Sequence, residues 1–379
     1  MMANTAGILL QNPILPMDLP DPDIIRVGDR YYMASASAHF TPGIPILKSR
    51  NLATWELAGY VYQRFCDDDA YNLSNGENVY GATACSICLR YHAGVYYVCV
   101  PCARTRRTYI YRSHNIESGR WSRSVLKDFY HDPTLFFDEG HCYLIYGQGT
   151  IFLLEVTTGA TAVKEDCPRQ VLVKTPRVNG VNCEGARLYK VADQYCLFLV
   201  QWPATGSNRK VQWCYRCPQL AGDYRGRVVL DSALGGWGGG VARGGVFCTE
   251  GGEWFALLSQ DCGAVGHCPV LVPMEWQDGW PVLGHGGHVP ERLPLPCWPS
   301  KLPLLVASDP FESDTNELHP VWQWNHNPDR QGWSLTERQG HLRLTNHTVV
   351  RDILSAPNVL TQKTVAPHCV LETHVDSTC

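Results

Sequence analysis

The chain has 379 residues, a formal net charge of −4 at pH 7 and 45% apolar residues, enough for one large globular domain and a smaller second one. Its basic residues form no run beyond the scattered Arg104, Arg106 and Arg107, which argues against a nucleic acid as ligand and favours a small or neutral partner. The 17 cysteines are an odd number in a large chain, which indicates free buried thiols rather than a disulfide framework.

The N-terminal segment MMANTAGILLQNPILPMDLPDPD has no basic region ahead of an apolar stretch and no apolar stretch of membrane-spanning length. We therefore expect no signal peptide and no membrane span. On that basis the protein is expected in the cytoplasm.

Five similar hairpins follow at intervals of roughly 45 to 65 residues, the period expected of propeller blades. They contain the segments PDPDIIRVGDRYYM, SICLRYHAGVYYVCV, HDPTLFFDEGHCYLIYG, CEGARLYKVADQYCLFL and GVFCTEGGEWFALLS. Further alternating strand pairs lie between them, so each blade should have four antiparallel strands. Helical periodicity is nearly absent. We therefore predict an all-β chain with a five-bladed β-propeller over residues 1–288.

The amino-acid composition changes after residue 288. Residues 289–307 contain a proline every few positions and are predicted to form an extended linker. Residues 308–379 alternate like sandwich strands in VWQWNHN, WSLTERQGHLRLTN and CVLETHV. This segment is short for a complete sandwich, so we expect a partial, apparently truncated β-sandwich.

Three of the hairpins carry an acid ahead of their first strand, namely Asp21, Asp132 and Glu184. The first strand of each propeller blade lines the central funnel, so these acids should converge at its mouth. Neighbouring acids shift each other's proton affinities apart, which lets one act as a protonated acid and another as an ionised base. Such a pair suits glycosidic bond cleavage, although each acid alone could equally cap a turn.

These segments resemble glycoside hydrolase family 43, the β-xylosidases and α-L-arabinofuranosidases. NPILPMDLPDPDIIRVGDRYYMASAS, HDPTLFFDEG and EGARLYK are similar to the segments of the family's three acids. The resemblance implies that Asp21 is the general base, Glu184 the general acid, and Asp132 the residue that tunes the pKa of the acid and orients it. It also implies an inverting hydrolase without a cofactor that releases xylose or arabinose from short oligosaccharides.

Four further residues are predicted to bind substrate. His39 and Phe40 lie in ASAHFTPG, and Gln201 and Trp202 follow the fourth inner hairpin. A histidine at the rim or a packed aromatic residue would give the same pattern.

Two positions depart from the family's pattern. Alignment by length places Cys85 where relatives usually have a tryptophan in the sugar pocket. Ala242 stands where many have an axial histidine that helps to site a cation, so no metal is expected.

Two cysteine pairs, Cys85-x-x-Cys88 and Cys99-x-x-Cys102, have the spacing of zinc ligands. Residues three apart in a regular strand face opposite sides of the sheet, so four thiolates would not converge. Zinc is therefore not expected.

Two other functions stay open at this point. One is a non-catalytic propeller that binds carbohydrate. The other is a retaining fructan-type glycosidase, whose reacting carboxyl groups would lie about 5 Å apart. The choice between xylose and arabinose and the oligomeric state stay open as well.

Overall fold

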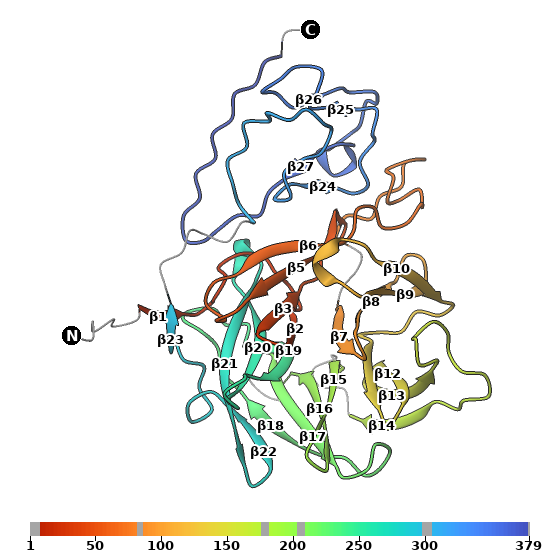
Figure 1. The fold of residues 1–379 in the computed structure, drawn as a ribbon, viewed down its shortest axis with the longest axis vertical. Helices are drawn as coiled ribbons and strands as arrows, with labels where there is room; N and C mark the ends of the chain where they lie inside the picture. The colour runs from red at the N-terminus through yellow and green to blue at the C-terminus, as the bar shows by residue number, and fades with distance from the viewer. Residues whose placement is uncertain (1–7, 82–85, 176–181, 203–208, 298–304, 378–379) are drawn as a thin grey trace.

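Five four-stranded antiparallel sheets make up most of the described chain, which comprises residues 8–81, 86–175, 182–202, 209–297 and 305–377 of a computed structural model. The sheets are arranged as blades around a common centre (Figure 1). Their innermost strands contact one another in the order β2, β7, β11, β15, β19 and back to β2. The predicted five-bladed propeller is confirmed.

Each blade is built from one continuous stretch of chain. Blade 1 contains β2 (Asp23–Val27), β3 (Arg30–Ala34), β5 (Gly43–Ser49) and β6 (Glu56–Tyr62). Blade 2 contains β7 (Cys88–His92), β8 (Val95–Cys102), β9 (Arg107–Ser113) and β10 (Ser122–Leu126). Blade 3 contains β11 (Thr134–Asp138), β12 (His141–Gln148), β13 (Thr150–Val156) and β14 (Gln170–Lys174). Blade 4 contains β15 (Glu184–Val191), β16 (Gln194–Gln201), β17 (Val211–Cys217) and β18 (Arg225–Leu230). Blade 5 contains β19 (Ala242–Cys248), β20 (Trp254–Asp261), β21 (His267–Gln277) and β22 (Trp280–Leu283).

An apolar core fills each of the five interfaces between adjacent blades. The inner and middle strands are therefore buried on both faces, which explains a nearly continuous apolar strand such as β8. Within β8, Cys99 belongs to the core shared with blade 3 and Cys102 to the core shared with blade 1. The two thiols thus face opposite sides of the sheet, as expected, and Cys85 lies outside the described residues.

The two ends of the propeller chain meet at blade 5. Strand β1 (Ile8–Gln11) pairs with β23 (Arg292–Cys297), so the predicted linker segment contains a strand. Beside this pair, the Asn12 side chain donates to the carbonyls of Leu271 and Pro290 and accepts from the Leu271 N–H group, each at 2.9 Å. These bonds connect the N-terminal segment to blade 5.

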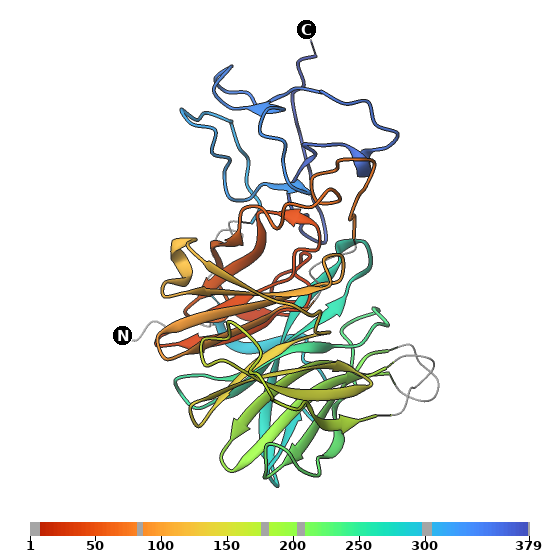
Figure 2. The same ribbon diagram turned by 90° about the vertical axis from the view of Figure 1, so that its right-hand side faces the viewer.

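Residues 305–377 lie against blade 1 (Figures 1 and 2). The short strand β24 (Gln323–Asn325) lies between β4 (Phe40–Thr41) of the propeller and β27 (Leu360–Thr361). A second pair joins β25 (Trp333–Ser334) to β26 (Arg343–Leu344). We call residues 305–377 the C-terminal unit.

Helical structure in the described residues is limited to three short 3-10 turns, η1 (Ile116–Ser118), η2 (Gly263–Val265) and η3 (Ile353–Ser355). None of the helices there has the length and apolar character to span a bilayer.

Candidate active site

One backbone position recurs at the entry to every blade. In blades 1 to 3 it stands two residues before the first ladder residue, for example before Asp23, which pairs with Ala34, and before Thr134, which pairs with Ile145. In blades 4 and 5 it lies within the bulge that directly follows the first ladder pair. All five residues at this position have positive φ, from 47° to 73°. In chain order they are Asp21, Ser86, Asp132, Gly185 and Arg243.

The predicted equivalence of the three acids holds for two of them and fails for the third. Asp21 and Asp132 occupy equivalent positions, but Glu184 stands one residue earlier than the Gly185 that is their equivalent. A bulge between Glu184 and Arg187 accommodates the offset. A positive φ is uncommon for a residue such as Arg243 and is typical of positions where the surrounding fold imposes the backbone conformation.

The guanidinium of Arg243 contacts all three predicted acids. Its Nε lies 2.8 Å from Asp21 Oδ1, its Nη2 2.9 Å from Asp132 Oδ2, and its Nη1 2.8 Å from Glu184 Oε1. All four side chains are largely buried. The predicted convergence of the three acids is therefore present, with a cation at its centre.

Two of the acids also bind the backbone of the following blade. Asp21 Oδ2 accepts from the N–H group of Ser86 at 3.0 Å, and Asp132 Oδ2 accepts from Gly185 at 2.9 Å. The Glu184 carboxylate accepts instead from the side-chain amide of Gln148 at 3.0 Å. Asp132 thus holds the residue next to Glu184, while one oxygen of Glu184 is held by a neutral donor.

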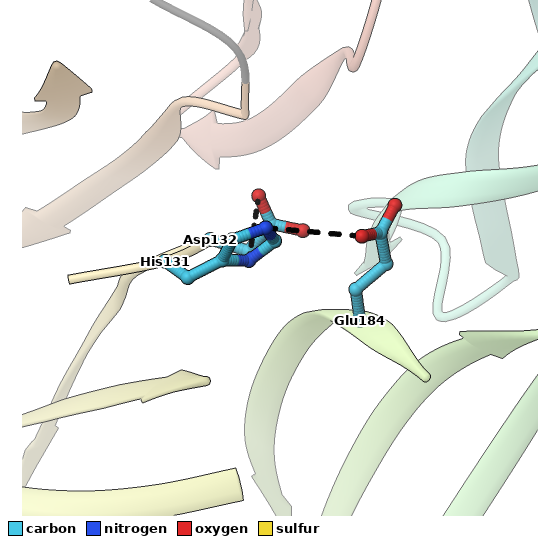
Figure 3. Close-up of side chains that lie close together, drawn as sticks. All are labelled: His131, Asp132 and Glu184. Atoms are coloured by element: carbon cyan, nitrogen blue, oxygen red, sulfur yellow. Dashed lines mark ion pairs between the residues drawn. The ribbon is translucent and has the colours of Figure 1, made fainter. Parts of the chain in front are cut away.

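His131 is a neighbour of the acids that the sequence reasoning missed. Its Nδ1 lies 3.6 Å from Asp132 Oδ1 and its Nε2 3.9 Å from Glu184 Oε2, and about a third of its side chain is exposed. Figure 3 shows the three side chains facing one another. Single ligand atoms of the three lie within 4.8 Å of each other, so they could hold a cation. Arg243 already pairs with two of these residues, so a cation would compete with its charge.

Deeper along the axis lies a second charged layer. Asp23 is fully buried and lies 2.7 Å from Nη1 of Arg90 and 3.4 Å from Nε of Arg187. Arg90 also donates to the Thr134 hydroxyl at 2.7 Å. This network joins the inner strands of blades 1 to 4, and the buried Ala242 of blade 5 has no ligand atom in its side chain.

The four predicted substrate-binding residues lie at two places. His39 is buried, and burial lowers its pKa to about 4; its ring lies 4.3 Å from that of the half-buried Phe40. Gln201 is buried at the end of β16, which pairs with the start of β15 beside Glu184, and Trp202 follows it half-buried. Their contact with a sugar stays a prediction. The predicted loss of a pocket tryptophan at Cys85 falls outside the described residues.

The sequence analysis missed Arg243, although the repeated hairpins contain a signal for it. The fifth hairpin lacks an acid at its entry, and the residue two positions before Gly245 is an arginine. His131 directly precedes Asp132 in the HDPTLFF segment. Aligning the five entries by position rather than by acidic character would have drawn attention to Arg243.

Two family models match this chain. One, described as Glycosyl hydrolases family 43, matches residues 10–281, and another, described as Beta xylosidase C-terminal Concanavalin A-like domain, matches residues 308–378. Similar proteins include a putative beta-xylosidase of Xylanibacter ruminicola, 31% identical over 91% of this chain and 65% of the relative. A beta-xylosidase of Formosa agariphila is 28% identical over 88% of this chain and 61% of the relative. A non-reducing end alpha-L-arabinofuranosidase of Bacteroides ovatus is 28% identical over 96% of this chain and 70% of the relative.

Solved structures resemble the whole described fold. A bifunctional GH43-CE protein of Bacteroides eggerthii superposes with a TM-score of 0.89 at 42% identity, covering 96% of this chain and 47% of that protein. The first two relatives that we name are covered over less than two thirds of their length. The chain thus spans only part of the length of the proteins it matches.

Proposed function

The chain belongs to glycosyl hydrolases family 43, and from that premise we propose that it is an inverting exo-glycosidase that releases xylose or arabinose from short oligosaccharides. The observation that carries this proposal is the contact of Arg243 with Asp21, Asp132 and Glu184. Three carboxylates from three different blades meet at one point at the end of the funnel. The names of similar proteins as beta-xylosidases and an arabinofuranosidase support the pentose specificity.

In the proposed reaction the Asp21 carboxylate removes a proton from a water molecule as the water oxygen bonds to the anomeric carbon. Glu184 enters the reaction with a proton and gives it to the glycosidic oxygen as the bond from that oxygen to the anomeric carbon breaks. Attack and departure on opposite faces of the sugar invert its configuration. The products are a free pentose and a shortened oligosaccharide.

Asp132 and Arg243 have positioning roles in this scheme. Asp132 holds the backbone N–H group of Gly185 and so places Glu184. The Arg243 guanidinium pairs with the carboxylates and orients Asp21. Residues 1–288 are proposed as the catalytic propeller, with His39, Phe40, Gln201 and Trp202 contributing to the sugar site.

The test combines two substitutions with two matched controls. Asp21→Asn and Glu184→Gln should each lower kcat for an aryl β-xyloside and an aryl α-L-arabinofuranoside by about 100- to 10,000-fold. Asp29→Asn and Glu139→Gln, in the hairpin turns at the opposite ends of β2 and β11, should keep normal rates. Proton NMR of the first product should show the inverted anomer. Normal turnover in both active-site variants would refute the assignment, and binding without turnover by the unaltered protein would favour a non-catalytic propeller.

A further inference from the structure

An exposed aromatic residue stands where the propeller meets the C-terminal unit. Tyr80 lies in the connection between β6 and β7, and 46% of its surface is exposed. Its ring lies 4.3 Å from the buried ring of His39, inclined at 38°. His39 in turn lies 4.9 Å from His326 of the C-terminal unit. The exposed ring therefore rests on a buried support.

The backbone on both sides of Tyr80 is held by these two histidines. The N–H group of Val79 donates to His326 Nε2 at 3.3 Å, and that of Gly81 donates to His39 Nδ1 at 3.1 Å. The N–H group of Tyr80 itself donates to Asn78 Oδ1 at 2.8 Å. Three consecutive N–H groups are thus bound to side chains, which restricts how Tyr80 can be presented.

His326 reaches this place because a strand of the C-terminal unit extends the propeller. Trp324 and Asn325 of β24 pair with Thr41 and Phe40 of β4, and His326 directly follows this pairing. His326 is completely buried. Part of the support of Tyr80 therefore comes from outside the propeller.

Tyr80 is also close to the proposed base. Just after β3, the Ala36 N–H group and the Ser35 hydroxyl both donate to the carbonyl of Pro20, the residue before Asp21. His39 follows Ala36 by three residues, a span of at most about 10 Å, and the Tyr80 ring lies against His39. These contacts place Tyr80 beside the segment that carries Asp21.

We propose that Tyr80 is a stacking residue for the sugar on the leaving-group side of the scissile bond, in a subsite to which the C-terminal unit contributes His326. The apolar face of a pyranose or furanose ring packs on an aromatic ring, and the stacking face of Tyr80 is retained in phenylalanine. The sugar to be released binds among the acids at the axis, so the rest of the oligosaccharide extends outward toward Tyr80. This inference rests on the proposed function.

Tyr91, in the strand β7 that follows the connection carrying Tyr80, is a matched control. Tyr91 is 42% exposed and lies 4.7 Å from the ring of Tyr96. It sits near the opposite end of β7, next to the turn that follows His92. An exposed tyrosine that merely packs on a neighbouring ring is therefore available at the far face of the propeller.

The kinetic test compares Tyr80→Ala, Tyr80→Phe and Tyr91→Ala on xylotriose and arabinotriose. Tyr80→Ala should raise KM for the hydrolysed trisaccharide by about 3- to 10-fold and leave kcat within about two-fold. The inhibition constant of the free pentose product should not change, because that sugar binds only at the axis. Tyr80→Phe and Tyr91→Ala should behave like the unaltered protein. His326→Ala should shift KM in the same direction as Tyr80→Ala. An unchanged KM in Tyr80→Ala would overturn the inference.

A binding test separates this inference from the proposed function. Calorimetric titration of xylotriose and arabinotriose into Asp21→Asn and into Asp21→Asn/Tyr80→Ala should show about 3- to 10-fold weaker binding in the double variant. Such a difference, with no turnover by the unaltered protein, would refute the hydrolase and support the subsite. Turnover by the unaltered protein with equal affinities in the two variants would refute the subsite alone.

Discussion

Arg243 is a side chain that no apolar or acidic pattern would single out, yet it contacts all three acids of the site. Its planar guanidinium offers donors in three directions, which lets one side chain bind three carboxylates from different blades. A lysine ammonium is a single point charge on a flexible stem and cannot reproduce this geometry. The position is also conformationally demanding, because φ is 70° there.

Substitution of Arg243 is therefore expected to affect catalysis strongly. Arg243→Lys keeps the charge but loses the simultaneous contacts, so kcat/KM for an aryl pentoside should fall by at least about 100-fold. Steady-state kinetics measure the loss, and circular dichroism should show an intact fold. The matched control is Arg216→Lys in β17, whose guanidinium lies 5.0 Å from the centroid of the Trp280 ring on an outer strand. Activity of Arg243→Lys equal to that of the control would contradict the role assigned to Arg243.

At the scale of elements, the pairing of β4 with β24 links two parts of the chain that lie far apart in sequence. Gln323 donates to the carbonyl of Pro42 at 2.8 Å, and Tyr60 donates to the carbonyl of Pro320 at 2.8 Å. Asn327 donates to the carbonyl of Cys66 at 2.9 Å. These bonds attach the C-terminal unit to blade 1 over several separate segments.

Two buried histidines in this junction make its stability depend on pH. Burial lowers the pKa of His39 to about 4, and burial together with the neighbouring His39 lowers the pKa of His326 to about 4. The ordinary value is 6.5, so between pH 6.5 and pH 4 the unfolded chain binds more protons at these residues than the folded protein does. The attachment of the C-terminal unit should therefore weaken as the pH falls through this range, by at most about 1.4 kcal/mol per pH unit for each histidine.

Thermal unfolding at pH 7, 6, 5 and 4 tests this expectation. His326→Asn removes one titrating group while leaving an acceptor near Val79, so its melting temperature should fall less between pH 6.5 and pH 4 than that of the unaltered protein. His341→Asn, at an exposed position, should retain the full pH dependence. Identical pH profiles for His326→Asn and the unaltered protein would contradict the assignment.

At the scale of the whole molecule, each blade is a continuous segment, and among the described strands none is exchanged between the first and last blades. The ring is completed by side-chain packing between blades 5 and 1, and the pair β1 and β23 lies beside this interface. Asn12 supplies three hydrogen bonds there. Removal of this buried amide lowers the free energy of unfolding, because it leaves buried backbone groups without hydrogen-bond partners.

Asn12→Ala is accordingly expected to destabilise the propeller by about 2 kcal/mol. It leaves the Leu271 N–H group and the carbonyls of Leu271 and Pro290 without the amide. The shift is measured as a lower midpoint of urea denaturation. Asn346→Ala, at an exposed position of the C-terminal unit, is the control and should leave the midpoint nearly unchanged. A midpoint for Asn12→Ala equal to that of the control would show that these bonds do not stabilise the ring.

The period of the hairpins and the position of an acid ahead of a strand were enough to predict the propeller and the meeting of Asp21, Asp132 and Glu184. These features are local, because alternation specifies strands and rotational repetition places equivalent residues at the same end of the funnel. The domain boundaries and the chemical roles of the acids stay predictions.

Other features were decided only by the tertiary structure. The contact of Arg243 with three acids, the one-residue offset of Glu184 and the buried pair His39 and His326 each join segments that are distant in sequence. Such contacts depend on side-chain direction and on the packing of one blade against the next, which a one-dimensional pattern does not contain. The sequence alone determined that Asp21, Asp132 and Glu184 enter the funnel, and the folded structure determined that they meet around Arg243.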